Sequence, residues 1–174
     1  VDLIESYYQN YGLKRFIFRL PTVYHYRPDP YFYKNGKKEM LAYRKLIKQA
    51  MDGEPIEMWG DPTLSKDIVY VKDFAQMVYK AILTDKDGGV YNVGTGKTTS
   101  LKEQIEGIIE VFSPKNKKSV IIPRPDMPDS RSFTMDITNA KEDLGYEPKY
   151  NYINYLKDFK KEMELNRFAE LWDK

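Results

Sequence analysis

The stretch from Trp59 to Val78, WGDPTLSKDIVYVKDFAQMV, constrains the fold of this 174-residue chain more than any other. It opens with a Gly-Asp-Pro sequence, whose residues break regular structure and favour a turn. The β-branched and aromatic run from Asp67 to Val71 then predicts a short strand that is largely buried. A helical pattern follows, so the stretch predicts a turn, a strand and a helix in that order.

The beginning of that helix is predicted at Asp73. A carboxylate at the N-cap accepts hydrogen bonds from backbone N–H groups of the first turn, which have no partner within the helix. Beyond it, Phe74, Ala75, Val78 and Ile82 have the spacing of one helical face. We expect this face to be buried.

The remaining elements are predicted from local signals. Ser100 and Glu103 form an S-x-x-E capping box, which places the start of a helix at Leu101. Residues 22–38 are aromatic and Pro-rich, which predicts an irregular loop. No internal repeat or low-complexity linker is present, so we expect one undivided domain. Helices are expected over residues 1–11, 39–51, 101–112 and 153–172, with a short one that Asp136 or Thr138 caps and Gly145 ends, and strands over residues 14–20, 56–59, 67–71, 90–93 and 119–122.

Bulk composition excludes several classes of function. The 28 basic and 26 acidic residues leave a net charge of +2, which is too balanced for binding nucleic acid or a membrane through the overall field. The absence of cysteine excludes disulfides, thiolate catalysis and Cys-ligated zinc, and it agrees with a cytoplasmic location. No apolar run approaches the roughly 20 residues of a membrane helix. No metal site is predicted, since the single histidine, His25, has no partner motif.

Five segments carry short motifs in a consistent order. They are FRLPTVY at residues 18–24, WGDPTLSKDIVYVKD at 59–73, YNVGTG at 91–96, IPRPDMPD at 122–129 and DITNAKEDLGYEP at 136–148. They resemble "lR…vyG", "wGdg…RD(f/y)vyVdD", "yNvG.g", "p.Rpgd" and "D.skA…LGw.P" of the extended short-chain dehydrogenase/reductase family. This family contains the NAD-dependent nucleotide-sugar epimerases and dehydratases.

The resemblance implies an α/β fold, the C-terminal substrate-binding part of an extended Rossmann-type enzyme, for residues 1–174. Two strands, Phe16 to Leu20 and Val90 to Val93, are expected to belong to a parallel sheet whose other part is missing. The family's GxxGxxG fingerprint and its catalytic YxxxK are expected upstream of Val1. The parent protein would then be an NAD-dependent epimerase or dehydratase, such as a UDP-sugar 4-epimerase. This chain alone would lack catalytic residues and be inactive.

The same resemblance assigns binding roles to residues here. Arg124 would pair with the diphosphate of a nucleotide sugar, because a guanidinium matches two phosphate oxygens bidentately. Lys66 stands where the family commonly has arginine, so it keeps the charge without the planar fork. Arg131 could supply the missing fork. Thr22 occupies the place of a polar residue that contacts the sugar nucleotide, and its hydroxyl could bond a phosphate oxygen.

Three apolar residues complete the expected site. Met58 and Trp59 fall where the family's backbone meets the nucleotide base, although both are also ordinary strand residues. Pro21 lies where family members approach the nicotinamide end of NAD, and its simpler role is to end a strand. NAD itself is expected to be held mainly by the missing N-terminal part.

Two other motifs point elsewhere. Residues 96–98, GKT, match the end of a Walker A motif, but the required earlier glycine is replaced by Tyr91 and the capping box starts the helix later. Tyr33 and Lys37 match YxxxK, but Gly36 and nearby prolines argue against the helix that this pair needs. His25 stands where the family has glycine and is interpreted as a loop residue without function.

Two alternatives to the enzyme remain open, a noncatalytic sugar-nucleotide-binding or assembly module of the same fold and, more remotely, a P-loop NTPase. The two strands of the incomplete sheet would expose apolar faces and unpaired edges. We therefore expect a homo-oligomer or self-association through these strands, or disorder around them.

Overall fold

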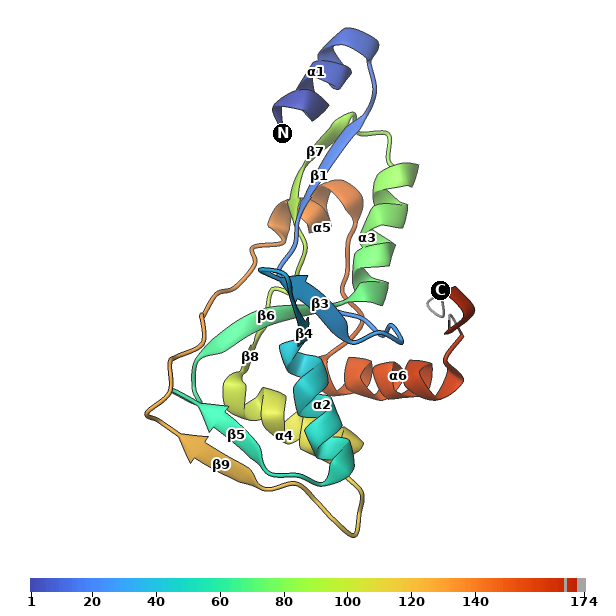
Figure 1. The fold of residues 1–174 in the computed structure, drawn as a ribbon. Coiled ribbons are helices and arrows are strands. Elements are labelled where there is room, and N and C mark those ends of the chain that lie inside the picture. The colour runs from blue at the N-terminus through green and yellow to red at the C-terminus, as the bar shows by residue number, and fades with distance from the viewer. Residues whose placement is uncertain (168, 172–174) are drawn as a thin grey trace. The chain divides into compact units, whose positions relative to one another are not determined.

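The computed structural model describes residues 1–167 and 169–171 (Figure 1). Its residues group into two compact units, and the chain enters each of them three times. The division follows no single point of the sequence, and the expectation of one undivided domain stays a prediction. Unit 1 contains residues 1–24, 66–98 and 133–150, and unit 2 contains residues 25–65, 99–132 and 151–174.

Unit 1 is built on parallel strand pairs. β1 (Arg15–Arg19) pairs with β7 (Gly88–Asn92), and β2 (Thr22–Tyr24) pairs with β6 (Ser65–Tyr70). The helix α3 (Val71–Leu83) connects β6 to β7, which belong to different strand pairs. β8 (Thr98–Ser100) is the third strand of the β2-β6-β8 sheet.

Helices cover these strands with apolar side chains. α3 and α5 (Thr138–Leu144) contact each other, and α5 also contacts β7. Phe16 and Phe18 of β1, the strand paired with β7, are partly buried and pack against the core of unit 1. α1 (Asp2–Tyr11) contacts β1 but buries none of its own residues. The buried core consists of Val69, Met77, Ala81, Tyr91, Val93, Ile137, Ala140, Leu144 and Tyr146.

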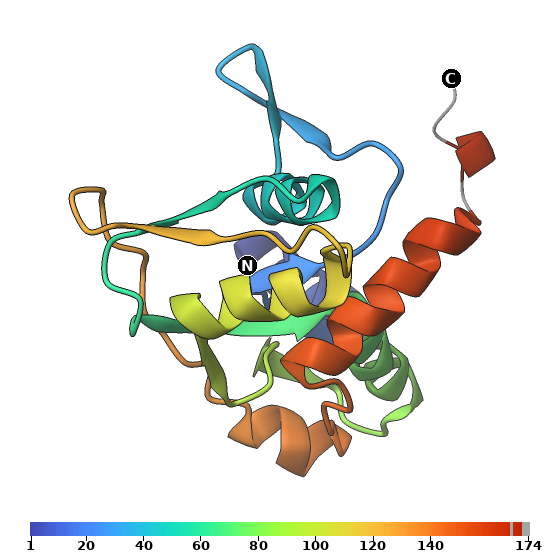
Figure 2. The ribbon, with the colours of Figure 1, turned by 90° about the horizontal axis from the view of Figure 1, so that it is seen from below.

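Unit 2 packs three helices and two strand pairs. α4 contacts α2, α6 and β5, so it is the central helix of this unit. Figure 2 shows β5 and β9 running side by side as a parallel pair. Phe159 of α6 lies edge-on against Tyr43 of α2 and Phe112 of α4. The elements are β3 (Tyr31–Lys34), β4 (Lys37–Met40), α2 (Ala42–Asp52), β5 (Ile56–Trp59), α4 (Leu101–Phe112), β9 (Ile121–Arg124), α6 (Tyr152–Leu165) and η1 (Ala169–Leu171).

Local signals predicted most of these elements correctly. The capping box is formed, since the Ser100 hydroxyl accepts from the Glu103 N–H and the Glu103 carboxylate accepts from the Ser100 N–H. Gly12 and Gly145 end their helices in the left-handed conformation, as the sequence predicted. The α/β class and its parallel strands are confirmed.

Two predictions about α3 were wrong. The helix begins at Val71, before Asp73, whose carboxylate instead accepts hydrogen bonds from the backbone N–H groups of Lys149 and Tyr150 at 2.8 and 3.1 Å. Burial raises the pKa of Asp73, and these two hydrogen bonds oppose the rise. The buried face was also misplaced by one position, because Asp73, Met77 and Ala81 are buried whereas Ile82 is exposed.

Other boundaries differ as well. Residues 22–38 contain strands instead of an irregular loop, including the β3–β4 hairpin, which turns at Asn35 and Gly36 with positive φ angles. Two consecutive positive φ values are typical of a two-residue hairpin turn, for which Asn-Gly is a favoured sequence. The prediction of an irregular loop overlooked this Asn-Gly signal. The strand expected at 119–122 lies at 121–124. The expected end of the last helix at residue 172 lies outside the described residues.

Candidate functional site

The β5–β9 pair brings three of the predicted binding residues together. Met58 is in register with Pro123, and Trp59 is in register with Arg124. Register partners in a parallel pair project from the same face, and side chains alternate along each strand. Ile56 is fully buried, so Met58 shares its inward face while Trp59 and Arg124 lie on the outward face.

The Arg124 guanidinium is held by two carboxylates. Its Nε and Nη2 donate to the two oxygens of Asp126 at 2.9 and 2.8 Å, and its Nη1 donates to Glu57 Oε1 at 2.8 Å. The hydrogen bonds that Arg124 donates to Asp126, and then to Glu57, raise the pKa of Arg124, so it stays charged. Three of its five N–H donors are therefore engaged within unit 2.

Trp59 joins the same group through its indole. Trp59 Nε1 donates to Glu57 Oε2 at 2.8 Å, while 46% of the residue's surface stays exposed. The pKa of Glu57 is lowered, first by this indole and also by Arg124, and the pKa of Asp126 is lowered by Arg124. We call Glu57, Trp59, Arg124 and Asp126 the β5–β9 cluster. It combines one cation, two anions and an exposed aromatic ring.

Thr22 and Lys66 lie together in the other unit. Thr22 of β2 is in register with Ile68 of β6, and Lys66 lies two residues earlier on β6. Because side chains alternate along a strand, Lys66 and Thr22 project from the same face of this sheet. A hydroxyl and an ammonium on one face are groups that a phosphate accepts from.

Lys66 differs from Arg124 in its surroundings. It is half-buried, and burial lowers the pKa of its ammonium. Among the residues described, no carboxylate pairs with the Lys66 ammonium, and no protein acceptor takes a hydrogen bond from it. A desolvated ammonium without a partner is unfavourable until an anion reaches it. Lys66 thus offers a phosphate an ammonium that no carboxylate of the described residues pairs with.

The other two predicted residues have fewer contacts. Arg131 is exposed in unit 2, and its guanidinium pairs with no group in the described part of the chain. Pro21 lies between β1 and β2 and has no N–H to donate. The expected contact of Pro21 with the nicotinamide end of NAD stays a prediction.

Asp67 is not among the residues predicted from the sequence to have a role, and it is fully buried in unit 1. Its carboxylate accepts from the Thr95 N–H at 2.9 Å, the Thr95 hydroxyl at 2.8 Å and the Gly96 N–H at 2.9 Å. A Cβ at Gly94 would lie 2.7 Å from Asp67 Oδ2 and 2.6 Å from Met135 Cβ. The KD motif at residues 66–67 and the NVGTG motif at residues 92–96 therefore meet at the Asp67 carboxylate. The presence of both motifs in the sequence was the signal that could have predicted this contact.

Neither rejected motif lies on the helix that its chemistry needs. Tyr33 and Lys37 are on opposite strands of the β3–β4 hairpin, and Tyr33 is in register with Lys38. Lys97 precedes β8, and the helix α4 begins only at Leu101, so Lys97 does not start a phosphate-binding helix. The His25 carbonyl accepts a hydrogen bond from the Tyr43 hydroxyl at 3.0 Å, which is a structural contact.

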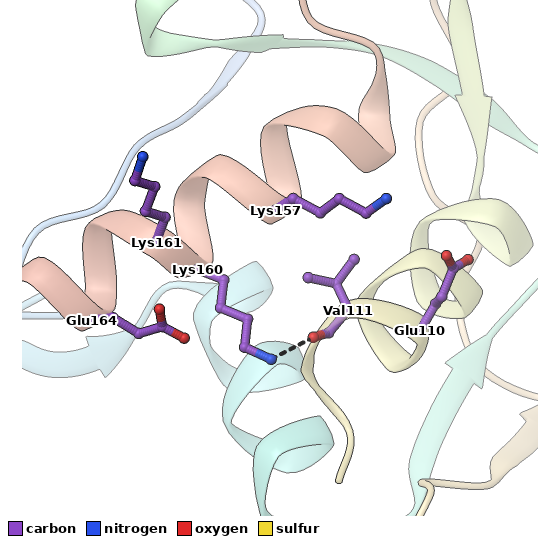
Figure 3. A pocket seen from close by; sticks show the side chains of 6 residues that line it. All are labelled: Glu110, Val111, Lys157, Lys160, Lys161 and Glu164. Carbon is purple, nitrogen blue, oxygen red and sulfur yellow. Dashed lines mark hydrogen bonds between the residues drawn. The ribbon is translucent and has the colours of Figure 1, made fainter. Parts of the chain in front are cut away.

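A pocket between α4 and α6 contains none of the predicted residues (Figure 3). Lys160 Nζ donates to the Val111 carbonyl at 2.9 Å, which satisfies a carbonyl at the C-terminal end of α4. We therefore interpret Lys160 at this pocket as a residue with a structural role. Its lining is Glu110, Val111, Lys157, Lys160, Lys161 and Glu164.

Within residues 1–167 and 169–171, no three His, Asp or Glu side chains are grouped to hold a metal ion. Over the same residues, every helix is too short or too polar to cross a bilayer.

Known proteins resemble the chain along most of its length. Residues 1–94 match the NAD dependent epimerase/dehydratase family. An uncharacterized protein of Methanocaldococcus jannaschii is 30% identical over 155 residues, which are 88% of this chain and 44% of that protein.

Solved structures agree with this match. The UDP-glucose 4-epimerase of Thermotoga maritima, solved with UDP-glucose, superposes with a TM-score of 0.71 and 28% identity over 94% of this chain and 51% of that one. The UDP-glucuronic acid 4-epimerase of Bacillus cereus, in complex with NAD, gives a TM-score of 0.69 and 25% identity over 95% and 49%. The chain thus spans about half the length of these proteins.

Proposed function

Because the chain belongs to the NAD dependent epimerase/dehydratase family, we propose that it is the part of a nucleotide-sugar epimerase or dehydratase that binds the sugar nucleotide. The ligand of the Thermotoga maritima structure, UDP-glucose, is a nucleotide sugar of the proposed class. In unit 2, Trp59, Arg124 and Arg131 are proposed to contact it, and Met58 is proposed to do so through its backbone. In unit 1, Thr22 and Lys66 are proposed as groups that can bind a phosphate.

The observation that carries this proposal is the pairing of Trp59 with Arg124 on the outward face of β5–β9. An exposed indole offers a flat apolar surface for a nucleotide base, and base stacking on aromatic side chains is favourable. An adjacent guanidinium offers donors for the phosphates that follow the base. Aromatic ring and cation are in register, so one nucleotide can reach both.

The chemical contribution of these residues is binding. A nucleotide diphosphate lies remote from the reacting sugar, and its binding energy can be used to orient that sugar. No residue here is assigned to proton or hydride transfer. NAD and the catalytic Tyr and Lys are proposed to belong to the other half of the enzyme, so this chain alone is proposed to be inactive.

Self-association is proposed from apolar exposure in unit 1. α1 buries no residue, and Val1, Leu3 and Tyr11 each expose more than two thirds of their surface. On β7, Val90 is also exposed. Exposed apolar side chains of this kind favour association with another copy or with another part of the same protein.

Isothermal titration calorimetry with UDP and dTDP tests the binding proposal. We expect the 174-residue chain to bind at least one of them, and Arg124→Ala to weaken binding by about tenfold or more, as for a lost charge-assisted contact. Lys115→Ala, which removes an exposed cation from the loop after α4, is the matched control and should bind as the unsubstituted chain does. Equal affinity of all three proteins would refute the role of Arg124.

A further inference from the structure

The charges around Arg124 do not suit an anionic ligand as they stand. Glu57 and Asp126 both contact its guanidinium, so one positive and two negative charges meet there. A diphosphate brings further negative charge to this point. Repulsion between like charges a few ångströms apart then opposes the attraction to Arg124.

The geometry of the Asp126 contact also opposes the binding of a phosphate to Arg124. Asp126 engages Arg124 by two parallel hydrogen bonds, from Nε and from Nη2. This is the bidentate arrangement that a phosphate group also uses on arginine. Asp126 thus occupies the edge of the guanidinium at which a phosphate would bind most strongly.

The two carboxylates differ in how firmly they are held. Glu57 lies on β5 and also accepts from the Trp59 indole, so a second hydrogen bond fixes it. Asp126 follows β9 by two residues and is exposed, and among the residues described Arg124 is the only side chain that hydrogen-bonds to it. Asp126 is therefore the carboxylate that can leave with least disruption.

We propose that Asp126 is an internal competitor of the phosphate ligand and sets the affinity of the site for nucleotide diphosphates. In the free chain its carboxylate takes the place of a phosphate on Arg124. When the ligand binds, the phosphate displaces the carboxylate, which turns to solvent. This inference rests on the proposed function, because it assumes that Arg124 receives the diphosphate.

The test is calorimetric titration of UDP into the unsubstituted chain and into Asp126→Asn. The asparagine keeps the size of the side chain but removes its charge, so we expect UDP to bind about fivefold more tightly. Asp126→Glu keeps the charge and should bind within about twofold of the unsubstituted chain. Glu54→Gln removes one exposed charge of unit 2 away from Arg124, and its affinity should also be unchanged.

The outcomes separate this inference from the function on which it rests. Unchanged or weaker binding by Asp126→Asn, with the unsubstituted chain binding UDP, overturns the competitor role and leaves the proposed function standing. Weaker binding would mean that Asp126 orients Arg124 for the ligand. Equal tightening by Glu54→Gln would show a general charge effect and also overturn the inference. Absence of binding by all four proteins, in titrations with dTDP as well as with UDP, overturns both proposals.

Discussion

The buried carboxylate of Asp67 accepts hydrogen bonds from both the backbone N–H and the hydroxyl of Thr95. A third bond, from the Gly96 N–H, completes its ligation by the loop after β7. These contacts fasten the loop to the middle of β6, which also carries Lys66. The carboxylate thereby stabilises the strand that carries Lys66, one of the residues proposed to bind phosphate.

Asp67→Asn should destabilise unit 1 strongly. The amide replaces one acceptor oxygen by an NH2 group that faces backbone N–H donors, so buried donors lose their partner. We expect a loss of about 2–3 kcal/mol in the free energy of unfolding, measured by urea denaturation. Asp61→Asn is the control, because Asp61 is exposed and asparagine can keep its turn contact with Thr63. A loss below 0.5 kcal/mol for Asp67→Asn, the ordinary size of a surface effect, would contradict this account.

Gly94→Ala should destabilise the same loop by a steric route. The new Cβ would meet Asp67 Oδ2 and Met135 Cβ at distances that force one of them to move. Overpacking of this kind costs about 1–3 kcal/mol. Since Asp67 is one of the crowded groups, the double variant with Asp67→Asn should lose less stability than the sum of the two losses. Strict additivity in a double-mutant cycle would show that the two positions are independent.

The capping box of α4 gives a prediction about pH. Hydrogen bonds from the Ser100 hydroxyl and backbone N–H lower the pKa of Glu103 below its ordinary value of about 4.5. A lowered pKa means that this stabilisation is complete above the ordinary value and is lost as the pH falls through the folded-state value. Glu103→Gln can keep the capping contact but does not titrate. Its stability difference from the unsubstituted chain should therefore be constant from pH 7 to 5 and change below about pH 4.5. A difference that stays constant down to pH 2.5 in thermal unfolding experiments would argue against the capping carboxylate.

Ser100→Ala tests the other half of the box. Loss of the N-cap hydroxyl should cost about 1 kcal/mol, seen as a lower midpoint of urea unfolding. Ser100→Thr, which retains a hydroxyl, should recover most of this loss. Equal losses for both variants would indicate that the hydroxyl is not what stabilises the helix.

Self-association can be measured by multi-angle light scattering. We expect the 174-residue chain to have an apparent mass above that of a monomer, and the double variant Leu3→Lys, Tyr7→Lys to return it toward the monomer. Ile82→Lys, which charges a single exposed residue of α3, is the control and should not change the mass. A monomeric mass for the unsubstituted chain at all concentrations would refute the proposed association.

The sequence predicted those parts of the fold whose signals are local. The capping box spans four residues, and Gly12 and Gly145 directly follow the helices that they end, so neighbouring residues sufficed to place them. Asp73 was misinterpreted because its actual partners, the N–H groups of Lys149 and Tyr150, are 76 and 77 residues away along the chain. Contacts of that separation depend on tertiary packing, which the local pattern does not contain.

The candidate site, too, was predictable from the sequence only in part. The resemblance pointed to Trp59 and Arg124 separately, and only strand pairing reveals that they are in register. Glu57 lies 67 residues before Arg124, so its ion pair could not be anticipated from spacing. Asp126, in contrast, is two residues away, and the Arg-Pro-Asp sequence could have drawn attention to it.

The most direct test of the central claim compares UDP with uridine, which lacks phosphates, in calorimetric titrations of the unsubstituted chain and of Arg124→Ala. If Arg124 receives the diphosphate, the substitution should weaken UDP binding by about tenfold or more and leave uridine binding within about twofold. Equal weakening for both ligands, or none for UDP, would contradict the claim that this guanidinium recognises phosphate.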